Sequence, residues 1–93
     1  MPSHDEIRKV LKSKLTVERL AGIEHDRWAH WQRYVHDQCE RREDGSLVVP
    51  AELVARWETQ AATPYAELSD QEQESDRDQV HKYLPTILDL LTS

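Results

Sequence analysis

The residues best suited to chemistry in this chain include a carboxylate that falls on an apolar helical face. Projection at about 100° per residue places Glu24 between Leu20, Trp28 and Trp31. A carboxylate among apolar side chains needs a cation or must hold a proton. Arg77 lies one turn before the apolar stripe of the last helix, and the sequence predicts that it pairs with Glu24. The pair could be structural or could form part of a ligand pocket, and an exposed Glu24 is the alternative.

A second group of residues could form a binding groove between helices. Trp57 and Tyr65 bracket a Thr-Pro dipeptide that ends one helix, so they are candidates for a partly open aromatic wall. We expect His25, Trp28, Tyr65 and Arg77 to converge on the same groove. Aromatic faces and a guanidinium suit a base and a phosphate. The competing interpretation is that these residues only stabilise the fold, since individual Trp and Tyr residues are mostly core residues.

Catalytic and metal-binding patterns do not stand out in the sequence. His25, His30 and His36 are spaced by five and six residues, and neither spacing stacks two imidazoles on one helical face. The lone Cys39 lies at the end of a predicted helix, beside Arg41 and Arg42, and has no accompanying oxyanion motif. We therefore predict a protein that is not an enzyme and that uses no metal or cofactor.

Composition limits the class of protein. The chain has 93 residues, of which 32% are charged, and a net charge of -6. Three Trp, three Tyr and clear apolar periodicity favour one folded domain over disorder. One cysteine, no long apolar run and no signal-like N-terminus predict a cytoplasmic protein that does not bind a membrane.

The charge is divided unevenly along the chain. Residues 1–42 carry nine Lys/Arg and seven Asp/Glu, a net +2, whereas residues 43–93 carry three and eleven, a net -8. The acidic half argues against duplex DNA as the main partner. Opposite charge on the two halves suits self-association instead.

The periodicity of apolar residues predicts an all-α fold of about four helices in a single domain, 1–93. The predicted helices cover 5–15, 17–40, 50–61 and the residues from Ser69 to about 91. Thr16 and Ser69 are the expected N-caps of the second and fourth helices. The turn sequence "EDGS" predicts an extended piece or a short hairpin near residues 42–50. Pro85 should kink or split the last helix.

Two motifs, "LAGIEHDRW" at 20–28 and "TPYAELSDQEQESDRDQV" at 63–80, resemble the ryanodine-receptor repeat, or RyR domain. The resemblance covers about residues 16–91, and the middle of the chain is closer to short stand-alone versions in bacteria and their phages. The matched positions are Leu20, Ala21, His25, Trp28, Pro64, Tyr65, Leu68, Asp76, Arg77 and Val80.

The resemblance implies an all-α, non-catalytic domain. RyR repeats are associated with adenine-nucleotide binding, and prokaryotic versions occur beside signal-sensing and defence proteins. We therefore expect a domain that binds, and could sequester, a nucleotide or nucleotide-derived signal, with an anti-defence role if the source is a phage. The alternative is a protein–protein interaction module or a self-assembling homo-oligomer that has no small-molecule ligand.

Overall fold

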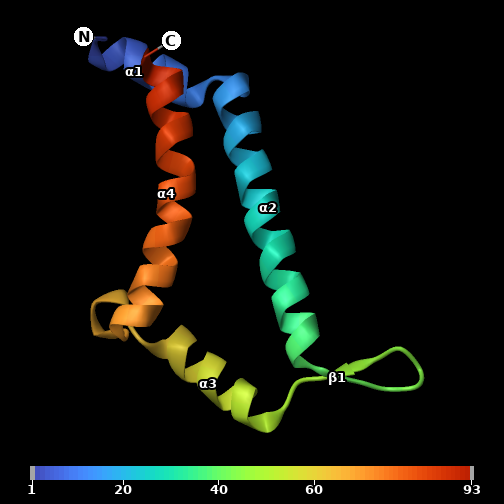
Figure 1. The fold of residues 1–93 in the computed structure, drawn as a ribbon. Coiled ribbons are helices and arrows are strands. Elements are labelled where there is room, and N and C mark those ends of the chain that lie inside the picture. Colours follow the sequence, from blue (N-terminus) through green and yellow to red (C-terminus); the bar gives the residue numbers. More distant parts are fainter. Residues whose placement is uncertain (1, 93) are drawn as a thin grey trace.

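The computed structural model describes residues 2–92 and is all-α apart from a two-stranded hairpin, which confirms the predicted fold class. Figure 1 shows two long helices side by side, bridged by a shorter helix at each end. In chain order the elements are α1 (His4–Lys12), α2 (Lys14–Gln38), β1 (Glu40–Arg41), β2 (Leu47–Val48), α3 (Ala51–Ala62), the 3-10 turn η1 (Tyr65–Glu67) and α4 (Asp70–Thr92).

The corner between α1 and α2 is built from two hydroxyl side chains. Ser13, not Thr16, is the N-cap of α2, because the Ser13 Oγ accepts from the Thr16 backbone N–H at 3.2 Å. The Thr16 hydroxyl is buried and donates to the carbonyl of Val10 at 2.6 Å. The predicted cap at Thr16 is therefore wrong by three residues, because Thr16 satisfies a carbonyl near the end of α1 instead.

Residues 43–46 form the turn of a short hairpin, which is one of the two alternatives that the sequence predicted for this region. Glu40 pairs with Val48 and Arg41 with Leu47 in antiparallel register. Gly45 has a φ of 89°, a conformation that favours glycine. The side chain of Asp44 accepts from the Ser46 backbone N–H at 2.9 Å, and the hydrogen bonds from Ser46 lower the pKa of that carboxyl.

The last two helices begin close to the predicted positions. Pro50 directly precedes α3, and the Ser69 Oγ accepts from the backbone N–H of Glu72 while the Glu72 carboxylate accepts from Ser69. This capping box confirms the predicted start of α4. Pro85 lies inside α4 without splitting it, because a proline removes one hydrogen bond while the ladder continues on either side.

Antiparallel contacts join α2 to α4. Arg19 pairs with Asp89 at 3.1 Å, and the Tyr83 hydroxyl donates to the Glu24 carboxylate. The two helices spread apart toward the end where α3 connects to the rest of the chain (Figure 1).

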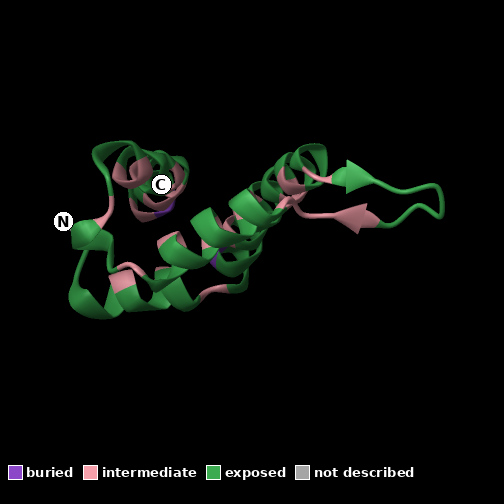
Figure 2. Cartoon of the chain, turned by 90° about the horizontal axis from the view of Figure 1, so that it is seen from below, coloured by how far each residue is buried: buried purple, intermediate pink, exposed green. Residues whose placement is uncertain are grey.

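The structure buries little of its apolar surface. Among the described residues, the buried ones are Thr16, at 1% exposed, and Leu90, at 7%. Figure 2 shows mostly exposed and intermediate positions along every helix. The radius of gyration is 18.2 Å, against about 12 Å for a compact domain of this length. Trp28 is 56% exposed, so the interpretation of Trp28 as a core residue is wrong, because the described helices do not enclose its ring.

Within the described part of the chain, no helix combines the length and apolarity needed to cross a membrane.

Candidate functional site

The space between α2 and α4 holds two adjoining cavities that share Arg27 and His30. The first has a volume of about 570 Å³ and is lined by Ile23, His25, Asp26, Arg27, Ala29, His30, Arg33 and Lys82. The second has a volume of about 920 Å³ and reaches α3 and the start of α4. It is lined by Arg27, His30, Trp31, Tyr34, Arg56, Trp57, Gln60, Ser69, Gln71, Glu72, Ser75, Asp76 and Gln79.

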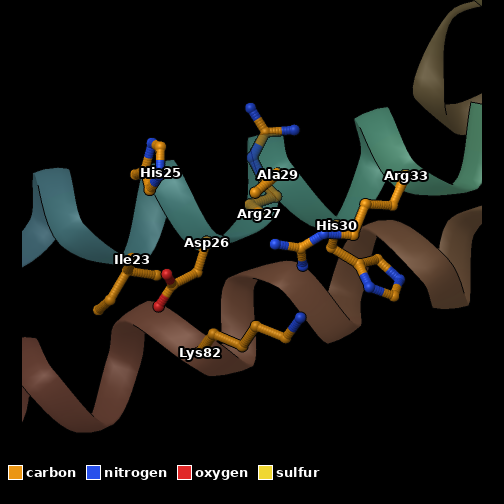
Figure 3. Close-up of a pocket in the computed structure, with 8 residues that line it drawn as sticks. All are labelled: Ile23, His25, Asp26, Arg27, Ala29, His30, Arg33 and Lys82. Atoms are coloured by element: carbon orange, nitrogen blue, oxygen red, sulfur yellow. The ribbon is translucent and has the colours of Figure 1, made fainter.

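Basic side chains converge in the first cavity. Figure 3 shows the Arg33 side chain folding back along α2, so that its guanidinium lies beside His30 and on the side of α4. The Lys82 ammonium extends from α4 toward the same space. His30 and Arg33 lie three residues apart and therefore project from neighbouring positions on one helical face.

These cations lack the acidic partners that usually accompany surface charge. The ion pairs found among the described residues are Arg19–Asp89, Arg27–Glu24 and Arg77–Glu74. Within that part of the chain no carboxylate lies within 4.0 Å of Arg33 or Lys82. Lys82 donates to the Gln79 side chain at 3.5 Å. Two cations and an imidazole thus face one space that they share with the carboxylate of Asp26, which forms an ion pair with neither cation among the described residues.

Aromatic rings gather in the second cavity. Trp31 and Tyr34 of α2 stack with ring centroids 5.5 Å apart and planes at 29°. Trp57 of α3 meets Trp31 edge-on at 5.8 Å and 61°. These are favourable aromatic geometries, and they connect α3 to α2. Arg56 lines the same cavity, so ring faces and another guanidinium border one hollow.

The structure distributes the predicted ligand residues over three places. His25 stacks with Trp28 at 6.0 Å and 26°, and His25 points away from α4 in Figure 3. Trp57 belongs to the aromatic cluster of the second cavity. Arg77 donates to the Tyr65 hydroxyl at 3.3 Å. The expected convergence of His25, Trp28, Tyr65 and Arg77 on one groove is not found in either cavity, because His25 borders the first cavity whereas Trp28, Tyr65 and Arg77 border neither.

The predicted pair of Glu24 with Arg77 is replaced by two local pairs. Arg27 Nε donates to Glu24 at 3.1 Å, and Arg77 donates to Glu74 at 2.9 Å. A partner three residues away on the same helix is within reach without long-range ordering, which explains the preference. The hydrogen bond from Arg27 is the main cause that lowers the pKa of the Glu24 carboxyl, and the Tyr83 hydroxyl adds to it.

The same contacts also shift the pKa values of the partner groups. The pKa of Tyr83 is raised, mainly by its hydrogen bond to the Glu24 carboxylate. The pKa of the Arg77 guanidinium is also raised, mainly by Glu74 and then by Tyr65. All of these groups lie at the surface, so the contacts define geometry more than they add stability.

Sequence reasoning missed Arg33, His30 and Lys82 as a group. One signal could have found them: if the long helix and the last helix run antiparallel, the residues that follow Trp28 face those that precede Tyr83. Cations are scarce in residues 43–93, where Arg56, Arg77 and Lys82 are the Lys and Arg residues. Two of these three line the cavities described above.

Searches for related proteins leave the RyR resemblance as a prediction, because no protein-family model, curated protein or solved structure matches the chain.

Proposed function

We propose that the chain is a non-catalytic binding domain for a small ligand that carries phosphate, of the nucleotide type. The observation that carries the proposal is the group of Arg33, Lys82 and His30 between α2 and α4. Unpaired guanidinium and ammonium groups bind phosphate oxygens through charge-assisted hydrogen bonds. Like charges held close together repel one another, and a bound anion would offset the repulsion between these two cations.

The adjoining aromatic cluster supports a ligand that has a base as well as a phosphate. Trp31, Tyr34 and Trp57 border the second cavity, and stacking of a base on an aromatic ring contributes about 1–3 kcal/mol. The volume of the second cavity, about 920 Å³, falls within the usual range for small-molecule sites. Because the two cavities share Arg27 and His30, one ligand could place phosphate in the first and base in the second.

The RyR resemblance points to the same class of ligand, although it indicated other residues. Under this proposal the domain holds its ligand without altering it, and sequestration of a nucleotide signal, including an anti-defence role in a phage, is the corresponding biological function. A cytoplasmic location fits this function and remains part of the proposal.

The proposal is tested by isothermal titration calorimetry of the whole chain against ATP, a 3′,5′-cyclic mononucleotide and a cyclic dinucleotide. Removal of one charged hydrogen-bonding partner costs about 1.5–3 kcal/mol, so Arg33→Gln and Lys82→Gln should each weaken binding by roughly ten- to a hundredfold. Arg41→Gln is the matched control, because Arg41 is an exposed hairpin residue that lines neither cavity. Circular dichroism checks that each variant is folded.

Two results would contradict the proposal. The first is an absence of binding to all three probes at millimolar concentration. The second is an equal loss of affinity in Arg41→Gln and Lys82→Gln, which would show that net charge matters and the cavity does not.

A further inference from the structure

The chain exposes more surface than a folded monomer of its mass. Its accessible surface is 7721 Å², whereas a monomeric globular protein of 10.9 kDa exposes about 5,600 Å². The excess is about 2,100 Å² per chain. Two chains that buried this excess would form an interface of about 4,200 Å² in total, within the range of obligate homodimers. The open shape therefore leaves exposed about as much surface as a second copy would cover in such a dimer.

One flank of α4 carries a continuous part of the exposed apolar surface. Val80, Leu84 and Leu88 recur every four residues and are 51%, 51% and 64% exposed. At about 100° per residue they form one stripe along the helix. Tyr83, whose hydroxyl donates to Glu24 of α2, lies about 100° away from Leu84 around α4. The apolar face of α4 is thus wider than the part that α2 covers.

The charges along α4 favour one orientation for a partner. Its first nine residues contain the five acids Asp70, Glu72, Glu74, Asp76 and Asp78. The C-terminal end of α4 lies beside α1 (Figure 1). Residues 8–14 contain the four cations Arg8, Lys9, Lys12 and Lys14. An antiparallel partner helix would bring the acidic start of each α4 toward the basic α1 region of the other copy.

We propose that the chain forms a homodimer in which α4 packs antiparallel against α4 of a second copy. The two-fold axis passes near Leu84, so that Leu84 meets its own counterpart and Val80 faces the partner's Leu88. A two-fold interface uses the same patch on both subunits, and a stripe of three evenly spaced apolar residues is self-complementary in this way. Complementary charges at the two ends fix the direction.

This interface does not rest on the proposed ligand site and leaves it accessible. Lys82 projects from α4 about 160° away from Leu84, and it faces the space beside α2. Dimerisation through the stripe would therefore cover one side of α4 while the cations on the other side remain open. Loss of the dimer and loss of ligand binding can be measured separately.

Disulfide trapping of the full-length chain tests the axis. In a Cys39→Ser background, which removes the native thiol, Leu84→Cys should form a disulfide-linked dimer at micromolar concentration under mild oxidation. Asp78→Cys is the matched control: it is exposed on the same helix but lies about 120° around it from Leu84. Non-reducing gels quantify both, and sedimentation equilibrium of the wild type should give twice the chain mass.

The result that supports the proposal is a dimeric mass with cross-linking at residue 84 at least tenfold faster than at residue 78. A wild type with the mass of one chain at micromolar concentration would overturn it. Equal cross-linking at residues 84 and 78 would also overturn it, since random collision would then explain both. Neither cysteine substitution should disrupt folding, because both are made at exposed positions.

Discussion

At the scale of single residues, the polar contacts of Glu24 show how the structure differs from the sequence projection. Glu24 does occupy the side of α2 that faces another helix, as its place between Leu20 and Trp28 predicts. Its partners are nevertheless Arg27 and, across the gap, Tyr83. A helical projection identifies a face but not which of several cations within reach will pair, and a local arginine costs less ordering than a distant one.

The lowered pKa of Glu24 makes stability depend on acid pH. The stability that the Glu24 contacts contribute is present above the usual pKa of 4.5. This stability is lost as the pH falls through the lowered pKa of Glu24 in the folded state. Glu24→Gln should therefore reduce the loss of stability between pH 7 and pH 3 in urea unfolding. Glu18→Gln, at an exposed position on the same helix, is the control. An equal reduction in both variants would mean that the Arg27–Glu24–Tyr83 contacts add nothing at neutral pH.

The exposure of Trp28 leads to a second prediction at this scale. Substitutions at exposed positions usually change stability little, so Trp28→Ala should cost less than about 1 kcal/mol. Trp57 is half-buried and contacts Trp31, so Trp57→Ala should cost more. Urea melts followed by far-UV circular dichroism measure both. A loss of more than 3 kcal/mol for Trp28→Ala would show that another molecule buries this ring in solution.

At the scale of elements, the corner between α1 and α2 depends on Thr16. Its buried hydroxyl donates to the Val10 carbonyl and accepts from the Ser13 hydroxyl at 3.0 Å. Thr16→Val would remove both hydrogen bonds, while the Val10 carbonyl keeps the one from the Ser13 backbone N–H at 3.1 Å. Each lost hydrogen bond costs about 0.5–1.5 kcal/mol, so we expect a loss of about 1–3 kcal/mol. Thr92→Val removes a comparable hydroxyl contact, at 2.8 Å to Leu88, from an exposed position and should change stability by less than about 0.5 kcal/mol. Similar losses in both variants would contradict the role given to the corner.

The elements themselves follow closely from the sequence, and their packing does not. Periodicity and local hydrogen bonding set the helices, the hairpin turn at Gly45 and the capping box of Ser69, because all of these depend on neighbours in the chain. The candidate site depends on the register between α2 and α4, which Arg19–Asp89 and Glu24–Tyr83 define. Such long-range pairs produce no periodic pattern in the sequence. For that reason the sequence identified Trp57 but assigned it to a groove with Tyr65.

At the scale of the whole molecule, the open arrangement suggests that folding and association are linked. Binding of a second copy to the folded state stabilises it by mass action. The thermal midpoint should therefore rise with protein concentration between micromolar and millimolar, which differential scanning calorimetry measures. A midpoint independent of concentration over this range would indicate a stable monomer and would contradict the proposed dimer.

The central claim is that a phosphate-bearing ligand with a base lies between α2, α3 and α4. The most direct test is the shift of the three tryptophan indole N–H signals in ¹⁵N NMR spectra, on addition of ATP, a cyclic mononucleotide or a cyclic dinucleotide at millimolar concentration. Trp31 and Trp57 line the proposed base site, whereas Trp28 stacks with His25 outside it. We expect the signals of Trp31 and Trp57 to move with at least one probe while that of Trp28 stays in place. No shift with any probe, or a shift confined to Trp28, would contradict the account.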